Sequence, residues 1–104
     1  MVECMQDLDT VFRSLADETR RDIIRRLRRE DLSIRAIALP YPLSYADVAK
    51  HVSVLARAGL VAKTRHGKEQ LVSLVPEALA DADTYLASCR RAWERRLDRL
   101  EVRL

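Results

Sequence analysis

Apolar side chains recur at helical spacing along the first third of the chain. Four of them lie three or four residues apart and predict one face of a helix that ends near Ala16, namely Met5, Leu8, Phe12 and Leu15. A second helix is predicted from Glu18 to Arg29, because Asp17 is a good N-cap residue and an acid in the first turn suits the helix dipole. We expect Ile23, Ile24 and Leu27 to form its buried face.

The middle of the chain predicts two further helices joined by a turn. Leu32 suits a very short strand, and Ser33 can cap a short helix that carries Ile34, Ile37 and Ala38. Two prolines, at 40 and 42, end that helix. Ser44 is the next N-cap residue, with an acid three positions later, and predicts a longer helix from Tyr45 to about Ala58. Gly59 is the left-handed residue that commonly follows a helix.

The last third of the chain predicts a hairpin and a long helix. Strand-forming residues at 60–65 and 69–74 flank a turn at His66, Gly67 and Lys68, and Pro76 suits the first turn of a helix. That helix carries an apolar stripe of Leu79, Ala82, Leu86, Cys89, Trp93, Leu97, Leu100 and Leu104. The order of elements predicts a mainly α (α+β) winged helix-turn-helix fold, with five helices and a two-stranded β-hairpin wing.

The helix at 45–58 has one apolar face and one face that suits duplex DNA. Val48, Val52 and Leu55 share the side expected to face the core. The candidate DNA-binding residues of this recognition helix and its cap are Ser44, Tyr45, Ala46, Ala49, Lys50, Ser53 and Arg57. Small or polar side chains near the start of such a helix can approach base edges, while cations and capping amides suit phosphates. The same pattern also fits the solvated side of a core helix.

The hairpin directly after this helix favours the DNA-binding interpretation. Its candidate DNA-binding residues are Lys63, Arg65, His66, Gly67 and Lys68, and Glu69 is the only acid beside them. A basic wing next to a basic helix face indicates a double-stranded DNA partner. For the arginine-rich segment 20–29, a solvated face that pairs with acids is the favoured interpretation over phosphate contacts. For His51, a packing role is favoured over base readout.

The composition fits one domain spanning residues 1–104. Hydrophobic residues make up 48% of the chain but aromatic residues only 5%, so aliphatic side chains must form the core. The net charge of +3 is a mild excess that suits a polyanion. No segment reaches the roughly 18 to 20 apolar residues of a membrane helix, and residues 1–10 lack a signal-peptide layout. We therefore expect a cytoplasmic, nucleoid-associated protein.

Two segments resemble the signatures of the ArsR/SmtB family of bacterial regulators. Residues 12–24, FRSLADETRRDII, resemble the second-helix signature LADPTRRxIL, and residues 48–61, VAKHVSVLARAGLV, resemble the recognition-helix signature VSKHLxxLxxAGLV. Glu18 stands where the family has proline, and Ala49 stands where it has a serine that can touch DNA. The resemblance spans nearly the whole chain and implies a dimeric repressor that binds an imperfect palindrome in promoter DNA.

The resemblance also implies that the first and last helices form the homodimer interface. The apolar stripe of the last helix supports this, because it is longer than one small domain can cover. The candidate interface residues are Leu8, Phe12, Leu15, Leu79, Ala82, Leu86, Cys89, Trp93, Leu97 and Leu100. Trp93, in the middle of the stripe, is the expected anchor, with a position in the core of its own chain as the alternative.

The residues of the family's familiar metal sites are not found at the corresponding positions. The third-helix region lacks cysteine, and the last helix has Asp81, Asp83 and Glu94 but no histidine, so we expect no metal and no cofactor. Cys4 and Cys89 leave a thiol switch open, although a buried, inert Cys89 is the favoured outcome. The two glycines and two histidines fit no catalytic motif, so an enzyme is not expected. A derepressor that responds to a thiol, metal or ligand effector and a winged-helix protein-interaction module remain as alternatives.

Overall fold

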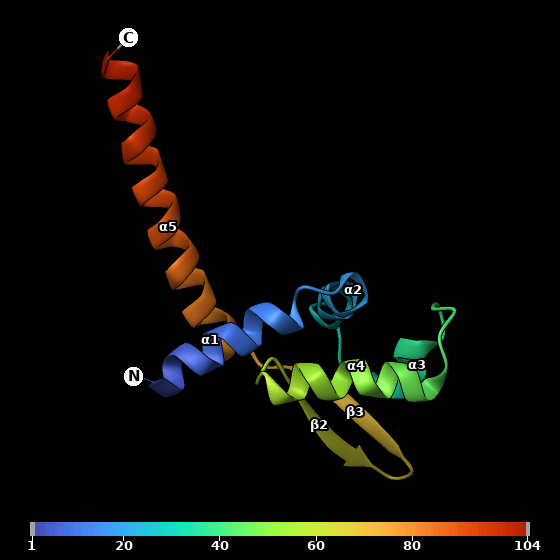
Figure 1. Ribbon diagram of the computed structural model, residues 1–104. Helices are drawn as coiled ribbons and strands as arrows, with labels where there is room; N and C mark the ends of the chain where they lie inside the picture. The colour runs from blue at the N-terminus through green and yellow to red at the C-terminus, as the bar shows by residue number, and fades with distance from the viewer. Residues whose placement is uncertain (1, 104) are drawn as a thin grey trace.

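The computed structural model describes residues 2–103, and side chains from residue 8 to residue 99. These residues form five helices and three strands in the predicted order (Figure 1). The elements are α1 (Val2–Ser14), α2 (Glu18–Leu27), β1 (Leu32–Ser33), α3 (Ile34–Ala38), α4 (Tyr45–Arg57), β2 (Val61–His66), β3 (Glu69–Leu74) and α5 (Pro76–Arg103). The winged helix-turn-helix prediction is confirmed.

Three helices begin at the residues that their capping side chains predict. Asp17 Oδ1 accepts a hydrogen bond from the Arg20 amide at 3.0 Å, and this bond is the main reason why the pKa of Asp17 lies below its usual value. Ser33 Oγ and Ser44 Oγ accept equivalent bonds at 3.1 Å at the starts of α3 and α4. Helix α2 ends at Leu27, two residues before the predicted end, because Arg29 N–H donates to the Arg26 carbonyl in a tighter turn.

The hairpin belongs to a three-stranded antiparallel sheet with the order β1-β3-β2. The short strand suggested by Leu32 is present and pairs Leu32 with Val72. Because His66 pairs with Glu69, the turn contains Gly67 and Lys68 alone, and the prediction that His66 belongs to the turn is wrong. Gly67 has φ 62°, as type II′ turns require of the first turn residue.

The first strand of the hairpin starts one residue later than predicted, because Leu60 belongs to the turn that closes α4. Gly59 has the expected left-handed φ of 79°. This conformation lets the Leu60 amide donate to the Leu55 carbonyl at 3.0 Å, which closes the helix in a Schellman-type turn. Strand β2 therefore runs from Val61 to His66.

The core consists of aliphatic side chains from all parts of the winged domain. Val48, Val52 and Leu55 of α4 are fully buried, as predicted, together with Ile23 of α2. Helix α1 ends at Ser14, slightly before the predicted end near Ala16, and its deepest residues are Val11 and Ser14. The predicted stripe residues Leu8 and Phe12, and Leu15 directly after the helix, are half-buried beside the core. The side chain of Met5 lies outside the described residues. Helix α1 therefore packs through a face next to the predicted one.

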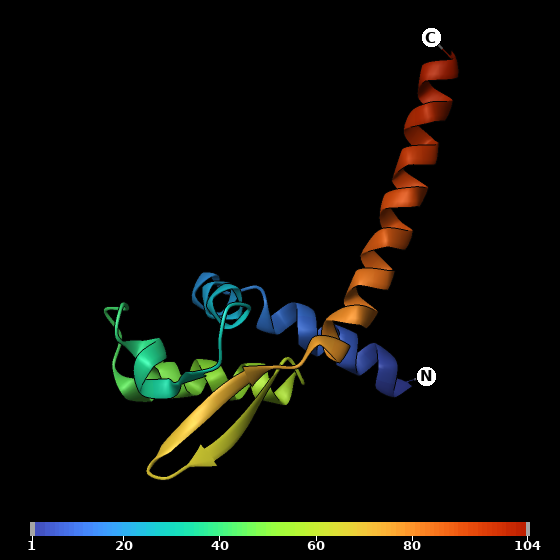
Figure 2. The ribbon, with the colours of Figure 1, turned by 180° about the vertical axis from the view of Figure 1, so that it is seen from behind.

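Helix α5 packs on α1 near its start and then projects away from the body (Figures 1 and 2). Ala82 is buried in the core, and the Tyr85 ring meets the Phe12 ring edge-on, with centroids 6.0 Å apart. The described chain measures 63 × 32 × 21 Å and has a radius of gyration of 17.4 Å. A compact domain of this length has a radius of about 13 Å. The difference reflects the long projecting helix.

Candidate nucleic-acid interface

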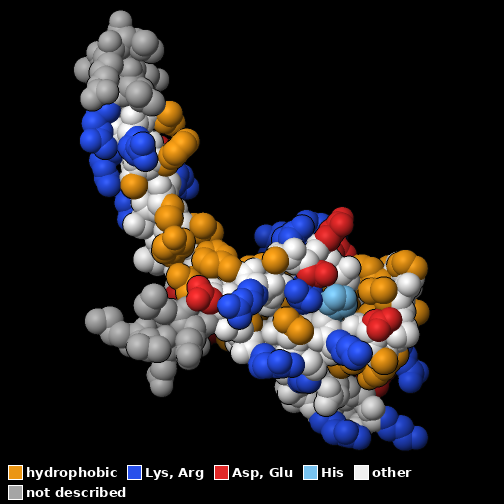
Figure 3. Space-filling view, viewed as in Figure 1, with side chains coloured by type: hydrophobic (Ala, Val, Ile, Leu, Met, Phe, Trp, Pro, Cys, Tyr) orange, Lys and Arg blue, Asp and Glu red, His pale blue; other side chains and the backbone are white. Residues whose placement is uncertain are grey.

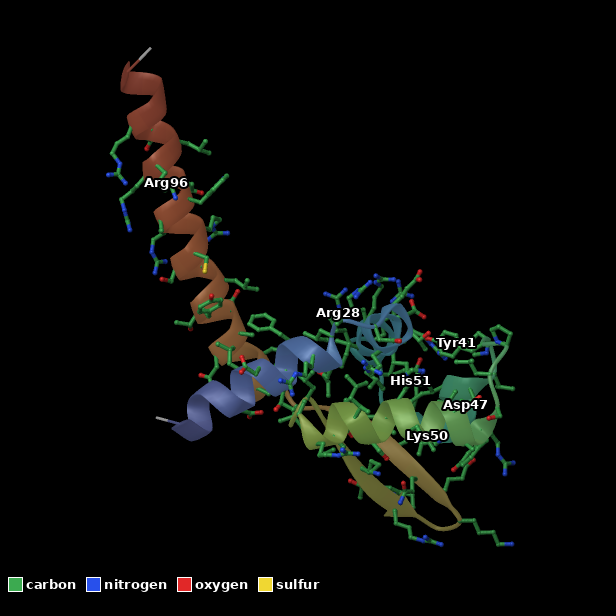
Figure 4. All side chains as sticks on the ribbon, in the orientation of Figure 1. Arg28, Tyr41, Asp47, Lys50, His51 and Arg96 are labelled. Atoms are coloured by element: carbon green, nitrogen blue, oxygen red, sulfur yellow. The ribbon has the colours of Figure 1, made fainter. Side chains whose placement is uncertain are left out.

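Helix α4 presents a solvent-facing surface opposite its core residues. Figure 4 labels Asp47 and Lys50 on this helix, which lies between α2 and the hairpin. The predicted recognition-helix residues that are exposed are Ser44, Tyr45, Ala46, Lys50 and Arg57. Ala49 and Ser53 are half-buried, and Ala49 packs against the core. The helix therefore offers a narrow surface with a hydroxyl cap at its start, Lys50 near its middle and Arg57 at its end.

The wing brings a second group of cations beside this surface. Its predicted DNA-binding residues, Lys63, Arg65, His66, Gly67 and Lys68, are all exposed. Lys63 lies opposite Val72 and therefore on the same sheet face, and its Nζ donates to Ser53 Oγ of α4 at 3.3 Å. This contact joins helix and wing into one surface.

One acid interrupts the positive charge of the wing. Glu69 lies opposite His66 in the hairpin, and its Oε1 is 3.9 Å from Nε of Arg35 on α3. Both side chains are exposed, so this ion pair contributes little to stability. Its larger effect is to offset part of the charge that an approaching phosphate meets.

A polar network holds α4 against the junction of α1 and α2. His51 lies between α2 and α4 (Figure 4), with its Nδ1 3.2 Å from Nη1 of Arg20 and 4.0 Å from Oδ1 of Asp17. Arg20 Nε also donates to the Ser14 carbonyl at 2.6 Å. The network places His51 in the packing role that its sequence position favours, and it orients α4 for its partner.

The arginines of α2 bind carbonyls at the ends of helices more often than they pair with acids. Arg21 donates to the Leu15 carbonyl at 2.8 Å, and Arg26 donates to the Ile37 and Ala36 carbonyls at the end of α3. The Arg26 guanidinium also lies 5.3 Å from the centre of the Tyr41 ring. Arg25 alone among the described arginines of this helix pairs with an acid, Asp22, at 3.1 Å.

The candidate interface residues of α1 and α5 fall into two groups. Leu8, Phe12, Leu15 and Leu79 are half-buried against the core, and Ala82 is fully buried there, so within the chain these residues have intramolecular contacts. Leu86, Cys89, Trp93 and Leu97 are exposed, with Trp93 62% exposed. Trp93 is therefore not a core residue of its own chain. The Leu100 side chain lies outside the described residues.

Cys89 is exposed and not buried as the sequence pattern favours. Its thiol lies one helical turn from Tyr85, and hydrogen bonding with this thiol raises the pKa of the Tyr85 phenol. The Cys4 side chain lies outside the described residues. Among the described side chains, residues 8–99, no three His, Cys, Asp or Glu residues come together as metal ligands. In the part of the chain that the structure describes, no helix has the length and apolar character needed to cross a membrane.

A helix-turn-helix followed by a basic wing defines the class of winged helix-turn-helix DNA-binding proteins. No family model matches the chain. The chain is 36% identical over 89 residues to the HTH-type transcriptional regulator Rv2034 of Mycobacterium tuberculosis, covering 86% of this chain and 80% of that protein. It is 27% identical over 79 residues to the transcriptional repressor SdpR of Bacillus subtilis, covering 76% and 88%.

Solved structures give the same result. An ArsR-like transcriptional regulator from Rhodococcus sp. RHA1 is 32% identical with a TM-score of 0.75, covering 92% of this chain and 91% of its own. Another ArsR family regulator is 26% identical with a TM-score of 0.80, covering 86% and 92%. A homodimeric winged helix-turn-helix DNA-binding domain from Mycobacterium bovis shares the fold, with a TM-score of 0.70 and 19% identity over 84% and 82% of the chains. The chain belongs to the ArsR family and is a DNA-binding transcriptional regulator.

Proposed function

We propose that this regulator is a homodimeric repressor that binds an imperfect palindrome in promoter DNA. Each recognition helix α4 enters a major groove, and the two half-sites lie about 34 Å apart along the duplex. Its place of action is the nucleoid in the cytoplasm, because its target is promoter DNA. Repression is supported by the similarity to SdpR, which is named a transcriptional repressor.

The observation that carries the proposal is the contact between Lys63 and Ser53. It aligns the wing with the exposed side of α4, so that Lys50, Arg57 and Arg65 face solvent on one continuous surface. We assign Lys50 and Arg57 to phosphates, and the small residues Ala46 and Ala49 to the approach of base edges. The wing cations contact the backbone of the neighbouring groove.

The exposed apolar stripe of α5 supports the homodimer. Leu86, Trp93 and Leu97 project from a helix that has left its own core, and a chain of this size gains stability by covering such residues. A second copy is the proposed partner because the Mycobacterium bovis domain of the same fold is homodimeric. Two α5 helices packed together set the spacing of the recognition helices.

A fluorescence anisotropy titration with duplex DNA from upstream of the protein's own gene tests the proposal. We expect saturable binding whose logarithmic affinity falls linearly with the logarithm of salt concentration, by about 0.9 per phosphate contact. A random duplex of the same length is the control and should bind at least 1,000-fold more weakly, as specific regulators require. Absence of salt-dependent binding would identify a protein-interaction module and contradict the proposal.

An effector-responsive version of the same function is supported by a pocket between α1, α4 and α5. The pocket has a volume of about 210 Å³, and its lining includes Val11, Gly59, Arg57 of the recognition helix and Asp81 of α5. A ligand bound there touches both the DNA-facing helix and the proposed dimer helix. Repeating the titration with cell-extract metabolites, with reductant and with zinc tests this, and unchanged affinity in every arm would favour a constitutive repressor.

A further inference from the structure

The projecting part of α5 carries a strong local excess of positive charge. Residues 90–99 contain five arginines and two acids, an excess of three charges that equals the net charge of the whole chain. The remaining 94 residues, wing and recognition helix included, are neutral overall. Segment 20–29 has a larger excess, with six arginines and one acid, but three of these arginines bind carbonyls at the ends of helices. Residues 90–99 therefore form a strong local excess of cations that lies outside the proposed operator interface.

Three of these arginines form a row along one side of the helix, which we call the arginine row. Arg91, Arg95 and Arg99 are spaced four residues apart, so neighbouring side chains are offset by about 6 Å along the axis. At about 100° per residue, the row lies opposite the apolar stripe of Leu86, Trp93 and Leu97. Figure 3 shows this separation, with blue Lys and Arg atoms along one edge of α5 and orange apolar atoms along the other. A partner that covers the apolar stripe leaves the arginine row in solvent.

The arginine row has no acid partner among the described side chains. All three arginines are exposed, and the ion pair on the described part of α5 joins Arg90 to Glu94 at 4.0 Å. Glu94 is thereby engaged by a residue outside the row. The three guanidinium groups therefore remain available to an external anion, and guanidinium groups match phosphate geometry well.

The arginine row is also remote from the surface that meets the operator. Figure 4 shows Arg96, next to the row on α5, at the opposite end of the molecule from Lys50 on α4. Helix α5 rises away from the wing along the longest dimension of the chain, which is 63 Å. A duplex bound by α4 and the wing cannot at the same time lie straight against the arginine row.

We propose that the arginine row is a second, sequence-independent DNA-binding surface that holds another duplex segment while α4 and the wing hold the operator. The row spans about 12 Å, and a duplex carries about one charge per 1.7 Å of its axis with both strands counted, so a segment of this length carries about seven phosphates and can supply one to each of the three arginines. Non-specific DNA sites have dissociation constants of about 10⁻⁴ to 10⁻⁶ M. A regulator already bound to DNA experiences neighbouring segments at high effective concentration, so weak affinity suffices.

A bridging assay tests this second surface, and it rests on the proposed operator binding for its first step. Beads carrying the upstream duplex are loaded with the full-length protein and then exposed to a fluorescent duplex of random sequence. We expect capture of the fluorescent duplex at low salt and its loss as salt rises. The variant R91Q/R95Q/R99Q should keep operator affinity within about twofold and capture at least tenfold less fluorescent duplex.

A rearranged variant separates the row from net charge. The substitutions E94R and R95E keep the composition of α5 but place an acid in the middle of the row, between Arg91 and Arg99, and we expect them to abolish capture as well. Circular dichroism and sedimentation velocity confirm that both variants remain helical and keep the wild-type assembly state. Capture by either variant at the wild-type level would overturn the proposal and leave the row as a solvated or protein-binding face.

A second measurement keeps the two DNA surfaces distinct. In the wing variant K63A/R65A/K68A, random duplex should still bind with a salt-dependent affinity, and adding R91Q/R95Q/R99Q should lower the log–log salt slope by about 2.7. An unchanged slope contradicts the arginine row. If the wild-type protein fails to load on the upstream beads while this slope change is present, then the operator proposal fails and the second surface stands.

Discussion

Arg65 and Lys68 lie at the exposed end of the wing, where no described acid pairs with either side chain. Such cations bind phosphates, which carry no direct sequence information. We expect Arg65→Ala and Lys68→Ala each to weaken binding of operator and random duplex by the same factor and to lower the salt slope by about 0.9. Anisotropy titrations at four salt concentrations measure both quantities, with Arg28→Ala, directly after α2, as the charge-matched control. A change in sequence discrimination instead of overall affinity would show that the wing contacts bases.

Asp17 links a local hydrogen bond to the pH dependence of stability. The bond from the Arg20 amide lowers the pKa of Asp17, so the folded protein holds this proton less tightly than the unfolded chain does. Its contribution is therefore present at neutral pH and is lost as the pH falls below the usual value of 3.8. We expect Asp17→Ala to cost about 1 kcal/mol at pH 7 and clearly less at pH 3.

Urea denaturation at fixed protein concentration measures this difference. Asp31→Ala, which removes an exposed acid outside the helices, is the matched control and should change the free energy of unfolding by less than about 0.5 kcal/mol at either pH. A cost of Asp17→Ala that is equal at pH 7 and pH 3 would contradict the role given to the carboxylate.

At the proposed DNA interface, helical spacing alone predicts which side chains of α4 are exposed. Lys50 and Arg57 lie opposite Val52 and Leu55 on α4, and the pattern of one helix is enough to place them. The hydrogen bonds of Arg20 and Arg26 were not predicted. Their acceptors are carbonyls at the ends of other helices, whose positions depend on how the helices pack. Sequence spacing carries no information of that kind.

At the scale of the elements, Gly59 fixes the passage from α4 to the wing. A Cβ at this position has room, since the nearest heavy atom lies 3.9 Å away, but the φ of 79° is unfavourable for any residue with a Cβ. We expect Gly59→Ala to destabilise the protein by about 1 to 2 kcal/mol through backbone strain alone. Thermal unfolding measures this cost. Ala80→Gly, at an exposed position in the first turns of α5, is the reverse exchange and serves as the control for the general effect of glycine against alanine. No loss of stability would show that the passage tolerates another conformation.

The starts of α2, α3 and α4 can be predicted from their capping residues, whereas the buried face of α1 cannot be predicted from its sequence. Asp17, Ser33 and Ser44 mark helix starts because their bonds are local. The buried face of α1 is set by its contact with α4 and α5, which brings Val11 and the small Ser14 inward and leaves Phe12 to meet Tyr85. When several neighbouring positions of a helix are apolar or small, the sequence alone cannot show which of them becomes the most deeply buried.

For the whole molecule, Trp93 provides the sharpest test of assembly. It is 62% exposed within the chain and lies in the middle of the apolar stripe of α5. We expect Trp93→Ala to weaken self-association by at least about 30-fold, as buried aromatic anchors typically do at about 2 kcal/mol or more, and to lower operator affinity with it.

Sedimentation equilibrium measures the association constant. Leu39→Ala serves as the control, because Leu39 is 80% exposed on the loop after α3 and lies away from α5. Equal self-association of Trp93→Ala and wild type would place the dimer contact elsewhere on the chain.

A single residue, Val75, separates the last strand of the wing from the first residue of α5. Its amide donates to the Leu60 carbonyl at 2.8 Å, which ties the junction to the start of the hairpin as well. We therefore expect the wing and α5 to move as one rigid unit, because no flexible linker lies between them. In the proposed dimer, each protomer contributes one such unit. A ligand or a mutation that rotates the two units relative to each other changes the distance between the wing tips, and thereby changes which operator spacings the regulator can bind.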